Sequence, residues 1–180
     1  MKYFRKIEGD ELYLSPMSAE DAQLNARWLN DVRITDGLGS TCRVFSAEQE
    51  RRWIESRAGD YQFAIVRKSD DCLLGNIGFD DLDFIHQRAE AGLFIGEEEN
   101  RGRGYGTQAL CLLLDYGFRQ LNLHNVMLKL FSFNERALAC YKKAGFREIG
   151  RRRQAYYGNG MFHDIIYMDI LREEFYARNR

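Results

Sequence analysis

The sequence predicts a mixed α/β fold of the α+β class, formed by residues 1–180 as a single domain. Three observations predict this fold. Short apolar runs separated by polar turns occupy the middle of the chain, an apolar helical period follows residue 104, and two extended segments flank a Gly-Asn-Gly turn near the carboxyl end. With 45% hydrophobic residues, a chain of 180 residues buries a core that requires neither disulfides nor a structural metal. We place this core within residues 10–175.

Two helices are predicted in the first third of the chain. Ser18-Ala-Glu-Asp21 opens the first, because a serine followed by acidic residues is typical of a helix start. Ser46-Ala-Glu-Gln49 is a capping box, which predicts a helix over residues 47–57. Residues 35–46 lie between them, contain two glycines and show no clear period. We expect a loop there that can line a site.

The central region predicts three meandering strands followed by a long helix. The strands correspond to the apolar runs at residues 63–66, 73–79 and 89–95. After Gly104, apolar residues recur at the spacing of one helix face. These positions are Leu110, Leu113, Leu114, Gly117, Phe118 and Leu121.

The last third predicts a strand, a helix and a closing hairpin. Residues 126–131 are strand-like, and residues 134–144 are helical with Gly145 placed to end the helix. The hairpin joins residues 149–157 to residues 163–171 through Gly158-Asn-Gly160. The tail, residues 172–180, is charged, and we expect it to be frayed.

Composition excludes several classes of protein. The 26 basic and 27 acidic residues give a net charge of -1, which excludes a polyelectrolyte and argues against a nucleic-acid partner. No run approaches the ~20 apolar residues of a membrane span, and the polar start of the chain resembles no signal peptide, so we expect no membrane partner and a cytoplasmic location. The four cysteines lack zinc spacing, so we expect no metal and mostly buried free thiols.

A glycine-rich loop between a predicted strand and the long helix is the strongest candidate for chemistry. It consists of Arg101, Gly102, Arg103, Gly104, Tyr105, Gly106 and Thr107. Glycines bring backbone N–H groups close to a ligand, and a helix N-terminus favours negative charge, so the loop predicts an anion site. The alternative is that the glycines only form a turn. The loop is neither a Rossmann nor a Walker motif, because the downstream acidic residue and the Gly-Lys-Ser/Thr sequence are absent.

This loop, as Arg101-x-x-Gly104-x-Gly106, resembles the pyrophosphate loop of the GNAT superfamily of acyl-CoA N-acyltransferases. Glu90 precedes it by eleven positions, and Asn134 with Tyr141 resembles the CoA-contacting helix of one branch. That branch comprises the spermidine N-acetyltransferases and the ribosomal-protein alanine acetyltransferases. The resemblance implies a mostly antiparallel twisted sheet that is splayed at the cofactor strand, with helices on both faces and a C-terminal hairpin.

The resemblance also implies roles for individual residues, with acetyl-CoA as co-substrate. Glu90 would accept the proton of the amine, or alternatively pair with Arg88 or another basic residue. Tyr141 would protonate the leaving thiolate, or alternatively be a core aromatic residue. Asn134 would bind the cofactor, or be only an N-cap. The backbone of the cofactor strand would bind the pantetheine and stabilise the developing oxyanion through Phe94, Ile95 and Gly96.

Substrate identity stays open at this level. The branch points to a polyamine or another small primary amine, but residues 37–44 contain no carboxylate, unlike the polyamine enzymes. Acetylation of a protein N-terminus or an amino sugar is the alternative. A non-catalytic acyl-CoA-binding module is the alternative from another class. Branch members form dimers or larger rings, so a homo-oligomer is an open expectation.

Overall fold

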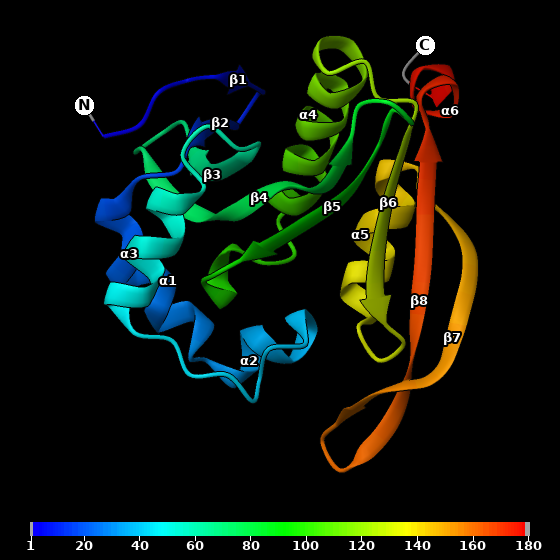
Figure 1. Ribbon diagram of the computed structural model, residues 1–180. Coiled ribbons are helices and arrows are strands. Elements are labelled where there is room, and N and C mark those ends of the chain that lie inside the picture. The colour runs from blue at the N-terminus through cyan, green and yellow to red at the C-terminus, as the bar shows by residue number, and fades with distance from the viewer. Residues whose placement is uncertain (1, 179–180) are drawn as a thin grey trace.

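The computed structural model describes residues 2–178, and its eight strands form one sheet in the order β1-β2-β3-β4-β5-β6-β8-β7 (Figure 1). The strands are β1 (Ile7–Glu8), β2 (Leu12–Pro16), β3 (Gln62–Arg67), β4 (Cys72–Asp83), β5 (Arg88–Ile95), β6 (Asn125–Phe131), β7 (Arg147–Gly158) and β8 (Met161–Leu171). Neighbouring strands are antiparallel except β5 and β6, which are parallel. The mixed α/β class and the mostly antiparallel sheet are therefore confirmed.

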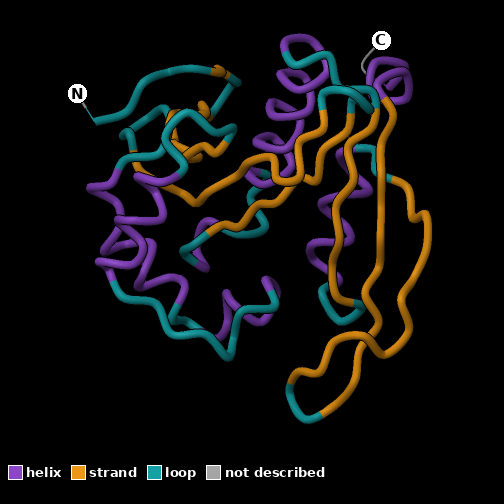
Figure 2. Tube along the Cα trace, viewed as in Figure 1, coloured by secondary structure: helices purple, strands orange, loops and turns teal. Residues whose placement is uncertain are grey.

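Helices cover both faces of the sheet, as predicted (Figures 1 and 2). They are α1 (Ala22–Leu29), α2 (Val32–Thr35), α3 (Ala47–Ser56), α4 (Tyr105–Gln120), α5 (Glu135–Ala144) and α6 (Arg172–Arg178), with short 3-10 turns η1 (Ala19–Asp21), η2 (Asp36–Leu38) and η3 (Glu98–Asn100). The alternation of side chains along β2 shows the two layers. Leu12 and Leu14 join the larger core under α4 and α5, whereas Tyr13 joins a smaller core with Trp28 of α1.

The sheet separates between β5 and β6. Their pairing is limited to residues 88–90 against residues 125–127, and beyond this point the two strands diverge (Figure 1). Residues 91–95 of β5 therefore have β4 as a neighbour on one edge and no strand on the other. This is the splayed cofactor strand that the resemblance implied.

Local signals in the sequence identify most other elements. The capping box of Ser46 and Gln49 is formed, and α3 follows it. Gly145 ends α5 with a left-handed φ of 109°, which only glycine adopts at low cost. The hairpin turn has positive φ at Asn159 and Gly160, the backbone of a two-residue hairpin loop. The long strands β7 and β8 extend beyond the rest of the sheet (Figure 2).

Two expectations are wrong. The tail does not fray over residues 172–178 but forms α6, because Phe175, 4% exposed, packs against Phe118 of α4 with ring centroids 5.5 Å apart. The remaining residues 179 and 180 lie outside the described part. The four cysteines are free but not mostly buried: Cys42 is exposed and the other three are half-buried. Within residues 2–178, no helix has the length and apolarity needed to cross a membrane.

Candidate active site

The glycine-rich loop leaves the start of α4 open. Gly102 and Gly104 have φ of 73° and 88°, and a Cβ atom at either position would meet nothing within 4 Å. Gly104 is the N-cap residue and provides no side-chain cap, so the first N–H groups of the 16-residue helix α4 have no capping side chain. The helix dipole adds partial positive charge there. The loop can therefore bind an anion such as a phosphate group.

Arg101 ties this loop to the end of β5. Its Nε donates to the carbonyl oxygen of Ile95 at 3.1 Å, and its Nη2 donates to the carbonyl oxygen of Gly96 at 3.0 Å. Burial, and then the nearby charge of Arg136, lower the pKa of the Arg101 guanidinium. Arg103 is exposed and forms no ion pair within residues 2–178. Arg101 thus shapes the site, whereas Arg103 offers a free cation beside it.

A second arginine connects the segment around the glycine-rich loop to the sheet. Arg67 of β3 donates from Nη2 to Asp70 at 2.7 Å and from Nη1 to Oδ1 of buried Asn100 at 3.2 Å. The same guanidinium is hydrogen-bonded to Tyr105 at the start of α4. These contacts fix both η3 and the first turn of α4 to the sheet.

The predicted backbone residues of β5 do not all face the gap beside β6. The N–H of Gly96 donates to the carbonyl oxygen of Leu74 at 2.9 Å. Because orientation alternates along an antiparallel strand, Phe94 and Gly96 direct their N–H groups to β4, whereas Leu93 and Ile95 direct theirs to the open edge. Of the three expected residues, Ile95 alone is available there. Leu93 was not predicted, because alternation cannot be assigned before the register is known.

Gly96 has a packing role instead. A Cβ atom at this position would lie 2.1 Å from Cε2 of Trp28, whose indole is 2% exposed and stacks edge-on to Phe94 at 6.1 Å. Trp28 Nε1 donates to Glu97 Oε1 at 2.9 Å, and Arg27 pairs with the same carboxylate. Glu97 thus pairs with α1, and the next residue, Glu98, lies 3.6 Å from Arg33 of α2.

Tyr141 and the start of α5 lie beside the loop. Asn134 is the N-cap of α5, with Oδ1 accepting from the Ala137 N–H at 3.1 Å. The Thr107 hydroxyl contacts Cys140 Sγ at 3.3 Å, which joins the first turn of α4 to α5. Tyr141, the next residue, is 9% exposed, and burial raises the pKa of its phenol. Tyr141 is therefore a core aromatic residue, as the alternative interpretation predicted. Its raised pKa also keeps the phenol protonated near neutral pH.

Glu90 lies on the opposite face of the sheet. Its neighbours Ala89 and Ala91 enter the larger core, so alternation directs Glu90 away from α4 and α5. Lys129 Nζ of β6 lies 2.8 Å from Glu90 Oε1, and this hydrogen bond raises the pKa of the Lys129 ammonium. Glu90 thus forms an ion pair with a basic residue, as the alternative interpretation predicted. Arg88 is not the partner, because it lies 3.5 Å from Asp83 instead.

Glu90 and Tyr141 therefore lie on opposite faces of the sheet, Tyr141 in the larger core. The first turn of α4 contacts α5 through Thr107 and Cys140, the residue before Tyr141. Sequence reasoning missed Lys129 because its partner is distant in the chain. The region of residues 35–46, expected to line a site, reaches Asn134, because a Cβ atom at Gly37 would lie 2.8 Å from its Nδ2.

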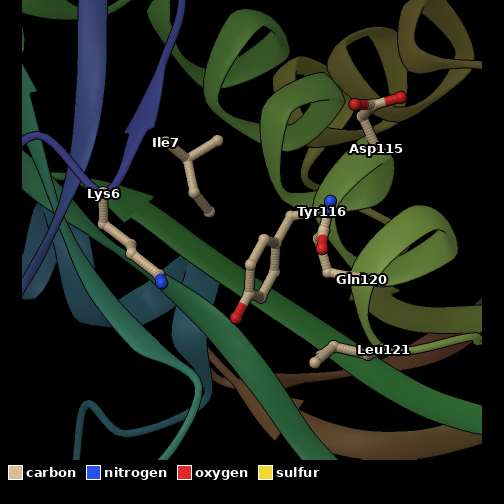
Figure 3. A pocket seen from close by; sticks show the side chains of 6 residues that line it. All are labelled: Lys6, Ile7, Asp115, Tyr116, Gln120 and Leu121. Carbon is tan, nitrogen blue, oxygen red and sulfur yellow. The ribbon is translucent and has the colours of Figure 1, made fainter.

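A separate cavity lies away from this site. It has a volume of about 460 Å³ between the N-terminal strand and α4 (Figure 3). Its lining consists of Lys6, Ile7, Asp115, Tyr116, Gln120 and Leu121. Asp115 already accepts from Arg119 at 2.8 Å and from Tyr176 at 3.3 Å, so its carboxylate is engaged. Among residues 2–178, no group of three or more His, Cys, Asp or Glu side chains is placed to hold a metal.

Known proteins resemble this chain in sequence and in fold. A Bacillus subtilis strain 168 protein, YdaF, provisionally named a ribosomal N-acetyltransferase, is 36% identical over 105 residues, 58% of this chain and 57% of the relative. Spermidine N(1)-acetyltransferase of Escherichia coli K12 is 33% identical over 100 residues, 56% of this chain and 53% of that enzyme. The matches thus span little more than half of these curated relatives.

The solved structure of spermidine N-acetyltransferase from Vibrio cholerae, in complex with CoA and spermine, superposes with a TM-score of 0.85. It is 23% identical and covers 93% of this chain and 99% of its own, which shows a shared fold. The family model of the acetyltransferase (GNAT) domain matches residues 11–147, which include β5, the glycine-rich loop and α5. This match establishes that the chain belongs to the acetyltransferase (GNAT) domain family.

Proposed function

We propose that the protein transfers an acetyl group from acetyl-CoA to a primary amine by direct attack of the amine on the thioester. The observation that carries the proposal is the separation of β5 from β6, with the uncapped start of α4 on one side and Glu90 on the other. When bound, acetyl-CoA supplies an acetyl group activated by a thiol leaving group. No step requires a metal ligand set from this chain.

The residues present fit a CoA ester. The open space at Gly102 and Gly104 lets backbone N–H groups of the loop and of α4 approach a pyrophosphate. Arg103 adds a cation at its rim. The unpaired edge of β5, at Leu93 and Ile95, can pair with the two amides of a pantetheine arm as a strand would. Asn134 keeps its Nδ2 group available, because only its Oδ1 serves the helix cap.

Glu90 is proposed to take up the proton of the amine. An alkyl ammonium has a pKa of about 10.4, so at neutral pH it must lose a proton before its nitrogen can attack. Glu90 is 23% exposed and holds one cation, Lys129, in its resting state. An incoming ammonium can replace Lys129 at this carboxylate and then pass its proton to Glu90, directly or through water.

Tyr141 is proposed to stabilise the leaving thiolate. Burial keeps its phenol protonated, and the residue before it, Cys140, contacts Thr107 of the loop that would bind the cofactor. Because a thiol has a pKa of about 8.5, below that of the phenol, Tyr141 acts through a hydrogen bond that strengthens as charge develops on sulfur. After the carbon–sulfur bond breaks, the thiolate takes its proton from solvent water, and Tyr141 keeps its own.

A thiol-release assay with acetyl-CoA and a panel of amines tests this proposal. We expect release of free thiol with at least one primary amine, and a higher melting temperature when CoA binds. Tyr141→Phe should lower kcat by about 10²-fold while keeping the CoA-induced shift. Tyr116→Phe, at the remote cavity, is the matched control and should leave both unchanged. No thiol release with any amine would contradict catalysis, and an intact CoA shift in that case would favour a non-catalytic module.

Four further proposals concern the acceptor, self-association, the domain and the location of the protein. Polyamines enter as acceptor candidates because relatives are named spermidine acetyltransferases, and protein N-termini enter through YdaF. One Vibrio cholerae relative is described as dodecameric, so we propose that this chain also self-associates. We infer one domain over the whole chain, because β7 and β8 complete the sheet begun by the matched residues. Use of acetyl-CoA favours a cytoplasmic location.

A further inference from the structure

Four aromatic side chains gather at the far end of β6. Phe131 and Tyr156 are stacked with ring centroids 3.8 Å apart, and Phe131 also stacks on Phe133 at 5.7 Å. Phe133 meets the His163 ring edge-on at 4.6 Å. All four side chains are half-buried, so parts of their ring surfaces remain accessible. We call these four residues the aromatic wall.

The aromatic wall lies on the same face of the sheet as Glu90. Leu128 and Leu130 of β6 enter the core under α4, so Lys129 and Phe131 point to the other face. Lys129 reaches Glu90 across the β5–β6 separation at 2.8 Å. Phe131 follows Lys129 by two residues, a rise of roughly 7 Å along a strand. A small substrate whose amine binds Glu90 is therefore long enough for its other end to contact the aromatic wall.

The loop after α2 borders the wall from the N-terminal side. A Cβ atom at Gly39 would lie 2.7 Å from Cζ of Phe131, so the loop backbone rests on the ring edge. Asp36 accepts from Asn159 Nδ2 of the hairpin turn at 2.9 Å. Loop and hairpin thus enclose the rings from two sides. This explains why the region between the predicted helices is glycine-rich.

The carboxylates around the wall already accept hydrogen bonds or pair with Lys129. Among residues 2–178, Glu90 is paired with Lys129, Asp36 binds Asn159, and Asp169 accepts from Asn125 at 2.8 Å. The Asp164 carboxylate accepts from the backbone N–H of Gln154 at 2.9 Å. Residues 37–44 contain no carboxylate at all. A second ammonium group would meet the Lys129 charge, and it would have to compete with amide N–H donors for the carboxylates of Asp36, Asp164 and Asp169.

We propose that the acceptor is a singly charged primary amine carried on an aromatic body, an arylalkylamine, whose ring packs on Phe131 and Tyr156 while its nitrogen reaches Glu90. The inference rests on the proposed function. In the reaction, the amine nitrogen forms a bond to the acetyl carbon and the carbon–sulfur bond breaks. The ammonium loses two protons in all: the first passes to solvent through Glu90 before attack, and the second leaves the nitrogen after attack and balances the proton with which CoA departs as the thiol. Lys129 selects against polyamines by like-charge repulsion.

Turnover of phenethylamine, tryptamine, spermidine and an alanine-initiated peptide tests the inference by thiol release. We expect kcat/KM for phenethylamine to exceed that for spermidine by at least about tenfold. Tyr156→Leu should raise the KM for phenethylamine by about three- to tenfold with little change in kcat, since it removes an aromatic contact but keeps an apolar side chain. Tyr157→Leu is the matched control, because Tyr157 is 63% exposed, and should leave KM unchanged.

Lys129→Met tests the charge selection. The quantity to compare is the ratio of kcat/KM for spermidine to kcat/KM for phenethylamine, both measured on the same variant. Any effect of the substitution on Glu90 changes both values alike and drops out of the ratio. We expect this ratio to rise about tenfold. A preference for spermidine or for the peptide in the unmodified protein would overturn the inference and leave the proposed function standing. So would equal effects of Tyr156→Leu and Tyr157→Leu.

Calorimetric titration of phenethylamine into the protein–CoA complex separates the two proposals. Binding that weakens in Tyr156→Leu without any turnover would refute the proposed function and support the aromatic wall as a binding site. Turnover of other amines together with no binding of phenethylamine would refute the aromatic wall alone. The CoA-induced rise in melting temperature, measured on each variant, shows that the variant is folded.

Discussion

Gly96 is the residue on which the end of β5 depends most directly. Gly96→Ala would place a methyl group 2.1 Å from the buried Trp28 ring, which has no free space to move into. We expect destabilisation of about 1–3 kcal/mol, seen as a lower melting temperature in thermal denaturation. Gly92→Ala is the control on the same strand, since a Cβ atom there meets nothing within 4 Å. Equal melting temperatures for the two variants would refute the packing role of Gly96.

Individual site residues differ in how far a sequence can identify them. Asn134 and Tyr141 occur in a helix whose start and end are encoded locally, so their relative placement follows from the helical period. The sequence assigns Glu90 to a strand and shows how many residues separate it from the loop. It does not identify the residue that pairs with the Glu90 carboxylate. Lys129 lies on another strand, and its contact with Glu90 exists only because β5 and β6 are parallel neighbours.

At the scale of elements, η3 and the start of α4 depend on the Arg67–Asp70 pair. The Arg67 guanidinium lowers the pKa of the Asp70 carboxyl to about 2. A lowered carboxyl pKa stabilises the fold above the unfolded value of about 3.9, and that contribution disappears as pH falls toward 2. Asp70→Asn should therefore lower the melting temperature at pH 6, and the difference from the unmodified protein should shrink between pH 4 and pH 2.

CoA binding provides a second measurement for the same pair. Loss of Asp70 frees Arg67, which also holds Asn100 and Tyr105, so we expect a smaller CoA-induced rise in melting temperature. Asp60→Asn is the matched control, because Asp60 accepts from Arg57 in a surface pair away from the loop. A pH-independent difference between Asp70→Asn and the unmodified protein would contradict the proposed electrostatic cause.

At the scale of the whole molecule, α6 closes the core from the carboxyl end. Phe175 contacts Phe118 at 5.5 Å and Tyr176 at 5.3 Å between ring centroids, although the charged sequence around it predicted a frayed tail. Phe175→Ala should cost about 3–5 kcal/mol, measured by denaturant unfolding. Phe162→Ala removes a ring that is 63% exposed on the hairpin and should cost less than about 0.5 kcal/mol. Similar costs for both would support fraying instead.

The sequence by itself determined the fold class, the long helix α4, the capped helices α3 and α5, the closing hairpin and the anion loop. Each is encoded by residues within one or two turns of each other, so capping, periodicity and glycine backbone freedom suffice. Only the tertiary structure decided the residue at which β5–β6 pairing ends, the Glu90–Lys129 pair, the aromatic wall and the docking of α6. These features join segments far apart in the chain, and their geometry depends on strand register and packing, which no local pattern specifies.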